Sequence, residues 1–334
     1  MKTAIVAPVH IQPSERWVDA LWNEATRADA HVIIVDDSDG KVTLPWNHDS
    51  KGDVYDYAAQ KKELGEELYA SFERFHHSAA CKQFGLWKAW KDGYDAVIVI
   101  DSDCIVSEGF ISAHLEALEQ KGAGWTNPLE TSSSEPFGTG KDWYSRGFPY
   151  SQRDLPKWAH MGLWEESLDL YGKDRVLNPD KSESFKVSGV FPSPATLPLS
   201  GMNVSFRASA VPYMLFLPNF NFRDKKFTRH DDIWGGYLFQ KIMREKGGSI
   251  SFGSPSVIHD TKVNASEDAA AEEPMLDYED RFLSLVDRAL VFSGSGSKHL
   301  EAPEIFSWLG REFANSTIFA GLTDAFEFWA KATE

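Results

Sequence analysis

Two short acidic clusters contain the side chains best able to do chemistry. Asp101-Ser102-Asp103 directly follows the apolar run Ala96–Ile100, so both carboxylates emerge where a buried strand would end. A divalent cation, Mn²⁺ or Mg²⁺, can bridge such carboxylates and a diphosphate, and it would neutralise the charge that grows as the diphosphate departs. A solvated turn is the alternative, because Asp is common after strands. The position after an apolar strand favours a metal and nucleotide site that includes Asp101, Ser102 and Asp103.

The second acidic cluster, Asp36-Asp37, follows another apolar run at His31–Val35. At this place in a nucleotide-binding half-domain, carboxylates accept hydrogen bonds from ribose hydroxyls or from the N–H of uracil. A turn explains the pair equally well. Lys82 is a candidate phosphate contact, and a solvated helix lysine is its plainer explanation. Pro8, near the end of the first apolar run, completes the predicted nucleotide-binding set.

Three residues far along the chain are further candidates. His259 follows the apolar Ser256–Ile258, and a neutral imidazole can complete a metal site built on Asp101 and Asp103. Asp231-Asp232 begins a helical pattern, in which one Asp serves as an N-terminal cap. The second is then free to orient a sugar hydroxyl or to shield an oxocarbenium-like centre. A structural histidine and a simple helix cap are the alternatives.

Two arginines lie in a stretch whose composition is typical of a substrate loop. Arg146 and Arg153 flank Gly147-Phe148-Pro149-Tyr150, within residues 122–156, which are rich in Gly, Ser, Pro and aromatic side chains. Arginine binds diphosphate through planar, charge-assisted hydrogen bonds. Composition alone favours ion pairing at the surface as the explanation of both arginines.

The elements that must position these residues follow from the apolar pattern. Thr3–Val9, His31–Val35 and Ala96–Ile100 are near-continuous apolar runs, which is typical of parallel strands covered on both faces. Helical spacing predicts helices over Ser14–Arg27 and Ser78–Lys91. The order predicts a parallel sheet with right-handed crossovers, and ligands bind such sheets at the carboxyl ends of the strands. Both acidic clusters are therefore expected at one edge.

The second half of the chain is predicted to be mainly helical. Asp231–Met243 is expected to form a helix, and Ser256–His259 a short strand. The acidic stretch Glu267–Glu273 has the composition of a linker. Beyond it, Met275–Val291 and Ala302–Ala332 have the apolar spacing of amphipathic helices. We therefore expect a helical extension at the C-terminus.

Composition excludes several classes of protein. The 334 residues carry a formal net charge of −16 and no long run of Lys and Arg, so we expect no nucleic-acid partner. No stretch approaches the roughly 20 apolar residues of a membrane span. The two cysteines, Cys81 and Cys104, are too few for a disulfide framework. A cytoplasmic protein is the expectation.

Two acidic motifs resemble a known fold, and five ordered segments resemble a known family. Val35–Ser38 followed by Ile100–Asp103 resembles the GT-A glycosyltransferase fold. Ser145–Arg153 is similar to the Arg-Gly-Tyr-Pro-Phe-Ser-x-Arg segment of the plant reversibly glycosylated polypeptides, also called UDP-arabinopyranose mutases, which form glycosyltransferase family 75. Other segments similar to that family, in the same order, are Ala80–Gly85, Gly162–Trp164, Gly201–Asn203 and Asp231–Gly236.

The resemblance implies roles for particular residues. The Asp-rich motif would bind the metal and a UDP-sugar. Arg146 would become reversibly glycosylated, with the chain itself as acceptor, and Arg153 would be the second required arginine. The plant motif has Asp where this chain has Ser102, and Ile11 replaces the arginine that follows the first strand. The second departure bears on which sugar and base are bound. Relatives assemble into oligomers, so the resemblance also implies a homo-oligomer.

These observations predict an α/β, Rossmann-like fold of the GT-A type, with a mixed, mainly parallel sheet flanked by helices. Residues 1–265 are expected to form the catalytic domain, with a nucleotide half over 1–104 and a sugar or acceptor half over 105–265, and 266–334 the helical extension. The expected activity is metal-dependent chemistry on a UDP-sugar, by self-glycosylation or by pyranose to furanose interconversion, as for UDP-arabinose. Transfer to a separate acceptor, hydrolysis, or a non-catalytic scaffold that binds sugar nucleotides are the alternatives.

Overall fold

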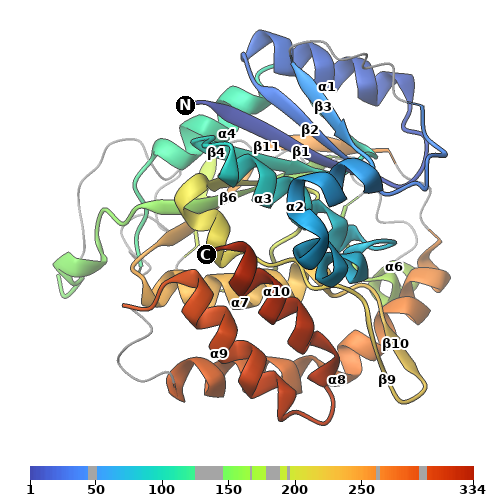
Figure 1. Cartoon of the computed structure of the whole chain (residues 1–334). Helices are drawn as coiled ribbons and strands as arrows, with labels where there is room; N and C mark the ends of the chain where they lie inside the picture. The colour runs from blue at the N-terminus through green and yellow to red at the C-terminus, as the bar shows by residue number, and fades with distance from the viewer. Residues whose placement is uncertain are drawn as a thin grey trace.

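The computed structural model describes residues 1–43, 51–124, 146–165, 168–177, 189–193, 196–260, 264–292 and 299–334. Its main feature is a nine-stranded mixed sheet in the order β3-β2-β1-β4-β8-β6-β11-β5, with β7 paired to β11 (Figure 1). The N-terminal half of this order is parallel, with β1 (Thr3–Val9) between β2 (His31–Asp36) and β4 (Ala96–Ile100) and with β3 (Gly52–Tyr55) at the edge. The three predicted strands are confirmed.

The remaining strands make the sheet mixed. β8 (Asn203–Arg207) is antiparallel to both β4 and β6 (Lys157–Glu165), so β4 and β6 run in the same direction. β11 (Ser249–His259), which contains the predicted strand at 256–259, is parallel to β6. β5 (Cys104–Ile105) and β7 (Val190–Pro192) are antiparallel to β11. The carboxyl ends of β1, β2, β4, β6 and β11 therefore share one edge.

Helices cover both faces of the sheet because β1 alternates its side chains between two cores. Ala4 and Val6 belong to one buried cluster, and Ile5 and Ala7 belong to the other. α1 (Glu15–Arg27) and α4 (Phe110–Glu119) cover the second cluster. α2 (Tyr57–Phe72), α3 (Lys82–Lys91) and α7 (Asp231–Glu245) cover the first. The predicted α/β fold with helices on both faces is confirmed.

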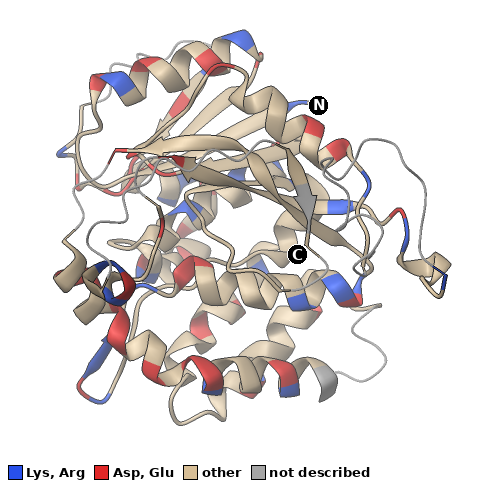
Figure 2. Cartoon of the chain, turned by 180° about the vertical axis from the view of Figure 1, so that it is seen from behind, with Lys and Arg blue, Asp and Glu red and all other residues tan. Residues whose placement is uncertain are grey.

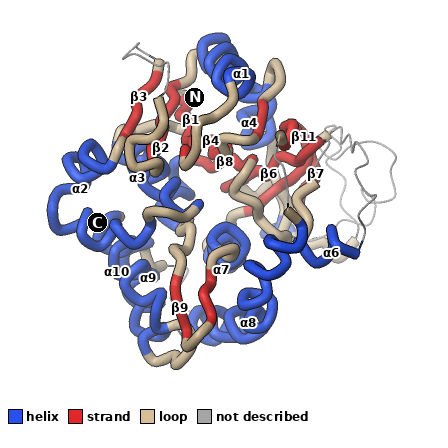
Figure 3. The backbone as a smooth tube through the Cα atoms, turned by 90° about the vertical axis from the view of Figure 1, so that its right-hand side faces the viewer, coloured by secondary structure: helices blue, strands red, loops and turns tan. Residues whose placement is uncertain are grey.

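The C-terminal helices extend the first of these cores into a third layer. They are α8 (Ala265–Phe292), α9 (Ala302–Ala314) and α10 (Thr323–Ala332), and Figure 3 shows them beneath the helices that cover the sheet. The indole of Trp87 donates to Ala332 O over 3.1 Å, and that of Trp329 donates to Pro212 O over 2.8 Å. The extension therefore packs directly on the α/β layer, and a domain boundary at residue 265 stays a prediction.

The predicted linker at Glu267–Glu273 is wrong, because these residues form the first turns of α8. Acidic side chains are favourable near a helix N-terminus, where they face the positive end of the helix dipole. α6 (Gly172–Leu177) also packs against this part of α8, and Gly172 N donates to the Glu272 carboxylate over 2.7 Å. An acidic composition was therefore mistaken for a linker where a partner helix orders it.

Short elements complete the described chain. β9 (Phe220–Phe222) and β10 (Lys225–Phe227) form a hairpin beside α8. Single 3-10 turns occupy Glu73–Phe75, Ala79–Cys81, Tyr150–Gln152, Ala208–Tyr213 and Ala320–Leu322. Most of the stretch 122–156 lies outside the described residues. Among the described helices, none is both long enough and apolar enough to cross a membrane.

Candidate functional site

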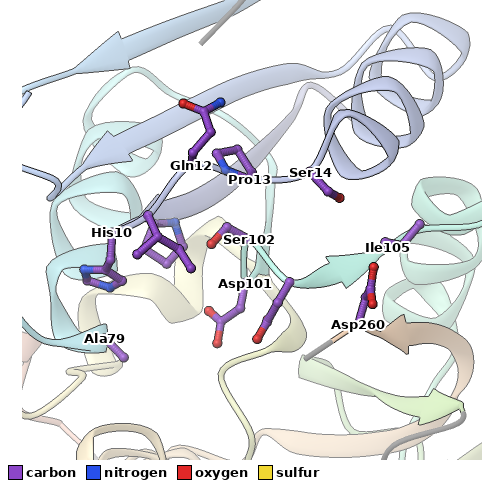
Figure 4. Close-up of a pocket in the computed structure, with 12 residues that line it drawn as sticks. His10, Gln12, Pro13, Ser14, Ala79, Asp101, Ser102, Ile105 and Asp260 are labelled. Atoms are coloured by element: carbon purple, nitrogen blue, oxygen red, sulfur yellow. The ribbon is translucent and has the colours of Figure 1, made fainter. Parts of the chain in front are cut away.

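A cleft of about 430 Å³ opens at the carboxyl ends of β1 and β4 (Figure 4). Figure 2 shows acidic residues gathered in the loops at this edge of the sheet. Four of the predicted site residues line the cleft: Pro8, Asp101, Ser102 and Asp103. The rest of the lining is His10, Ile11, Gln12, Pro13, Ser14, Ala79, Ile105 and Asp260. The rule that ligands bind at the carboxyl ends of parallel strands therefore predicted the position of the cleft from the sequence.

Asp103 and His259 form one half of the predicted metal site. The carboxylate Oδ2 of Asp103 lies 3.5 Å from His259 Nε2, because β5 and β11 pair His259 with Cys104. Burial opposes the charge of Asp103, but the interactions with His259, together with hydrogen bonds from the backbone and Cys104, outweigh it and lower the pKa of the carboxyl. An oxygen and a nitrogen at this separation fit adjacent ligand positions around a divalent cation, whose bonds are roughly 2.0–2.6 Å long.

Asp101 is turned toward a different partner. Its carboxylate accepts a hydrogen bond from Lys82 Nζ over 2.9 Å, and Lys82 is 1% exposed. Burial raises the pKa of Asp101 against the opposing effect of Lys82. Lys82 was predicted to contact phosphate, yet its ammonium is held by protein groups, including Gly201 O at 3.3 Å. In this structure the lysine acts as the counter-charge of Asp101.

Asp231 and Asp232 lie around the same lysine, at the start of α7. Burial opposes the charge of Lys82, and Asp101, Asp231 and Asp232 together outweigh it, so the pKa of the ammonium is raised. Burial raises the pKa of both carboxyl groups. Asp232 accepts a 2.7 Å hydrogen bond from Gly201 N, whereas Oδ2 of Asp231 is buried without a hydrogen-bond partner among the described residues. Neither aspartate lines the cleft, so both stand one layer behind it.

Position 201, in the segment 201–203 that resembles the family, has no room for a side chain. A Cβ at this position would lie 2.9 Å from Lys82 Nζ and 2.9 Å from the Phe216 ring. Any side chain would therefore push Lys82 away from Asp101. Asn203 has a structural role, because it is fully buried and its amide donates to Leu163 O and to Pro255 O over 3.0 Å each.

The carboxylates of Asp36 and Asp37 accept hydrogen bonds from groups of the protein itself. Asp36 accepts a 2.9 Å hydrogen bond from Ser38 N, which is the turn that its sequence also allowed. Asp37 accepts from His10 Nδ1 (3.0 Å), His76 Nδ1 (2.9 Å), the Tyr57 hydroxyl (2.9 Å) and His77 N (2.7 Å). Burial opposes the Asp37 charge, but these donors prevail and hold its pKa well below the usual range. Neither residue lines the cleft.

A second group of metal-ligand atoms lies at this corner. Within the described residues, atoms of His10, Asp37 and Cys81 come within 4.8 Å of one another. A carboxylate has about four lone-pair sites, and the four donors around Asp37 use all of them. The thiol of Cys81 is fully buried, which raises its pKa. The cluster is therefore better suited to holding the His10 ring than to binding a cation.

The structure does not bring the arginines to the cleft. Leu155 pairs with Gly122, and β6 begins at Lys157, so the segment 146–156 lies at the edge where β4 begins. Asp95 is level with the start of β6 and is six residue steps from Asp101 along the chain, which is about 20 Å. Figure 1 shows the green segment near residue 150 projecting at the side of the N-terminus. Arg146 is exposed, and Arg153 stacks 3.9 Å over the Tyr150 ring.

Sequence reasoning missed two titratable residues of the cleft, His10 and Asp260. Asp260 follows His259 and donates its backbone N–H to Asp103 O over 2.8 Å. His10 follows β1, as Asp37 follows β2 and Asp101 follows β4. A polar residue at the end of each parallel strand was the available signal. This signal was used to select the aspartates as site residues, but it was not used for His10.

The fold and cleft define an α/β protein with a carboxylate-rich site at the carboxyl ends of its strands. Comparison with known families makes the class specific. Residues 7–332 match the reversibly glycosylated polypeptide family, and the chain belongs to it. Over 247 residues the chain is 27% identical to the probable UDP-arabinopyranose mutase 5 of Arabidopsis thaliana, covering 71% of this chain and 68% of the relative. The family resemblance of the sequence is thus confirmed.

Solved structures are more distant. Glucosyl-3-phosphoglycerate synthase from Mycobacterium tuberculosis, in complex with Mn²⁺ and UDP-glucose, aligns at 13% identity over 82% of this chain and 76% of that chain, with a TM-score of 0.41. Mannosyl-3-phosphoglycerate synthase from Rubrobacter xylanophilus aligns at 11% identity over 84% and 75%, also with a TM-score of 0.41. Alignments this loose transfer neither residues nor substrates.

Proposed function

We propose that this protein is a metal-dependent UDP-sugar enzyme that interconverts or transfers the sugar, and that its chemistry takes place in the cleft around Asp101 and Asp103. The observation that carries the proposal is the position of the Asp-Ser-Asp motif, in a cleft at the carboxyl edge of the sheet, in a member of a family that includes a probable UDP-arabinopyranose mutase. A UDP-sugar would place its diphosphate beside these carboxylates.

Asp103 and His259 are the proposed ligands of the cation, Mn²⁺ or Mg²⁺, with Asp101 nearby. The 3.5 Å separation of their ligand atoms fits such a cation, and an oxygen-nitrogen donor set suits it. When bound, the cation would neutralise charge on the departing diphosphate. Lys82 holds Asp101 at 2.9 Å and so fixes the second carboxylate at the cleft. Pro8 and Ser102 line the nucleotide side.

Asp231 and Asp232 are proposed to steer the sugar from behind Asp101. Burial raises the pKa of both carboxyl groups, that of Asp232 to about 8, so at neutral pH Asp232 holds a proton and would orient the sugar through a hydrogen bond rather than through charge. The buried Oδ2 of Asp231 remains able to accept a hydroxyl hydrogen bond. Asp36 and Asp37 are then proposed to shape the nucleotide end of the cleft through the residues they hold.

Arg146 is proposed as an attachment site for the sugar, supplied to the cleft by a second copy of the chain. Its segment lies about 20 Å from Asp101, at the opposite edge of the sheet, and Arg146 is exposed there. One chain cannot present this residue to its own cleft in the described conformation. A neighbouring copy can, so self-glycosylation would proceed between chains. Arg153, stacked on Tyr150, would support the segment.

The experiment that tests the function is a screen of UDP-sugars with Mn²⁺, in which UDP-arabinopyranose, UDP-glucose and UDP-galactose are followed by chromatography. Interconversion gives a furanose product, hydrolysis gives free sugar, and self-glycosylation adds mass to the protein. Asp103→Asn is expected to lower turnover by on the order of 10²–10³-fold, because one ligand of the cation is lost.

Asp154→Asn is the matched control, since Asp154 lies at the opposite edge and forms only a 3.6 Å ion pair with Lys121. Its turnover is expected to equal that of the wild type. Circular dichroism of both variants checks the fold. Equal turnover in Asp103→Asn and Asp154→Asn would remove the proposed metal site, and no turnover of any UDP-sugar by the wild type would remove the proposed function.

A further inference from the structure

His10 is the one residue with a basic side chain among the twelve that line the cleft. The other charged members are Asp101, Asp103 and Asp260, all acidic. Figure 4 shows His10, Asp101 and Asp260 distributed along the cleft. A diphosphate in this space would lie beside carboxylates, and a cation would have to separate the two. Among the described residues that line the cleft, His10 is the only one whose side chain can carry a positive charge.

The His10 ring is oriented by a buried carboxylate. Asp37 Oδ2 lies 3.0 Å from His10 Nδ1, and the Asp37 side chain is fully buried. Asp37 stays ionised because several donors surround it, so the proton of His10 in the neutral state belongs on Nδ1. The orientation of the ring and the tautomer are both fixed by this contact.

The second ring nitrogen is the one that can act on a ligand. Its recorded neighbour is the Cys81 thiol, with Sγ 4.0 Å from Nε2, which is a long and weak contact. The His10 side chain is 37% exposed, so a ligand in the cleft can reach the ring. Imidazole gives and takes a proton readily near neutral pH, and a carboxylate behind it stabilises the cation.

We propose that His10 is the proton donor to the diphosphate leaving group, with Asp37 as the residue that positions it. This rests on the proposed function. When the bond between the anomeric carbon and the β-phosphate oxygen breaks, the electron pair stays on that oxygen. The proton of His10 Nε2 passes to the diphosphate, and His10 keeps its Nδ1 proton bonded to Asp37. The proton returns when UDP is recaptured, or is replaced from water if water takes the sugar.

The titratable groups around His10 come from three parts of the chain. Asp37 follows β2, Cys81 lies in the turn before α3, and Asp101 follows β4. Behind Asp37, His76 and Tyr57 complete its hydrogen bonds. This arrangement resembles a surface pair at the other edge of the sheet, where His31 Nε2 lies 2.9 Å from Asp53 Oδ2. His31 is not in the cleft, so it provides a matched control.

The test compares His10→Gln with His31→Gln, using UDP-arabinopyranose and UDP-glucose with Mn²⁺. His10→Gln is expected to lower kcat by about 100-fold, the usual range for a lost general acid, with a smaller change in KM. The limb of the wild-type pH–rate profile that reports the acid should be absent in His10→Gln. Asp37→Asn should displace that limb. Added imidazole should restore part of the activity of His10→Gly, because it can enter the cleft.

Three results would overturn the proposal. His10→Gln could keep kcat within about twofold of His31→Gln while the wild type turns over UDP-sugar, in which case the proposed function survives and His10 has no part in it. Purified wild type could hold one zinc per chain that His10→Gln and Cys81→Ser both lose, which would make the corner a metal site. A wild type that binds no UDP and turns over no UDP-sugar would remove both proposals together.

Discussion

Two buried lysines at opposite edges of the sheet have opposite surroundings. Lys82, at the carboxyl edge, and Lys157, where β6 begins, are each 1% exposed. Three aspartates surround Lys82 and raise the pKa of its ammonium despite burial. Lys157 has Gln120 Oε1 at 3.2 Å, and burial lowers its pKa to about 8. Burial therefore disfavours the charge of both lysines, and only the aspartates around Lys82 outweigh it.

The contrast indicates that the two edges of the sheet have different parts in the proposed function. The carboxyl edge concentrates carboxylates around one internal ammonium, and the resulting negative potential suits a metal and a positively charged sugar. The opposite edge carries the arginine segment, with Arg146 exposed. The proposed metal site and the proposed acceptor segment, separated in this way, cannot meet within one chain in the described conformation.

The largest expected effect is an exchange of sugar between two variants. Asp103→Asn keeps Arg146 but lacks a metal ligand, and Arg146→Ala keeps the cleft but lacks the acceptor. Mixed with UDP-glucose and Mn²⁺, the Asp103→Asn chain should gain one hexose by intact-mass spectrometry, while neither variant gains it alone. If the wild type gains mass and the mixture does not, the arginine reaches its own cleft and the separation of the edges breaks down.

The two lysines give the next largest effect. Lys82→Met should lower the free energy of unfolding by about 3–5 kcal/mol at pH 7, because Asp101, Asp231 and Asp232 lose the positive charge that they surround. Lys157→Met should leave it unchanged or raise it by about 1–2 kcal/mol, since a charge that burial disfavours is removed. Urea unfolding followed by tryptophan fluorescence measures both. Equal losses in the two variants would show that burial, not the surrounding charge, decides.

Stability should also depend on pH through Lys157. Its pKa of about 8 in the folded protein lies below the ordinary value of 10.5, so between these values the unfolded chain binds the extra proton. The contribution of Lys157 to stability therefore rises with pH over this window, and it is constant below pH 8. The unfolding midpoints of wild type and Lys157→Met should converge from pH 8 to 10. Lys121→Met, an exposed lysine at the same edge, should show no such convergence.

The smallest effect is expected for Arg153→Ala. Its guanidinium stacks 3.9 Å over Tyr150 and donates to Phe148 O over 2.9 Å, so it supports the arginine segment. Loss of such a contact, worth about 1–2 kcal/mol, should slow the labelling of Arg146 by about 5–30-fold. UDP-sugar turnover should stay within about twofold. Arg223→Ala, which removes a similar stack on Phe222, should change neither rate. A large loss of turnover would place Arg153 in the chemistry itself.

The apolar pattern of the sequence predicted the three central parallel strands and the edge of the sheet at which the cleft lies. The runs at 3–9, 31–35 and 96–100 are apolar throughout because both faces of these strands are buried, and β1, β2 and β4 match them. Since parallel strands end at a common edge, the residues after them had to meet. The resembling segments also identified the family before the fold was known.

Which polar residues face the cleft depends on tertiary contacts that the sequence pattern does not show. Lys82 was predicted to contact phosphate, but it is surrounded by Asp101, Asp231 and Asp232. Asp37 accepts hydrogen bonds from protein donors, and His10 is the basic residue that lines the cleft. The arginine segment, close to other motifs in the chain, lies at the far edge. Such placements depend on contacts between residues far apart in sequence, and local pattern cannot encode which charges will become neighbours.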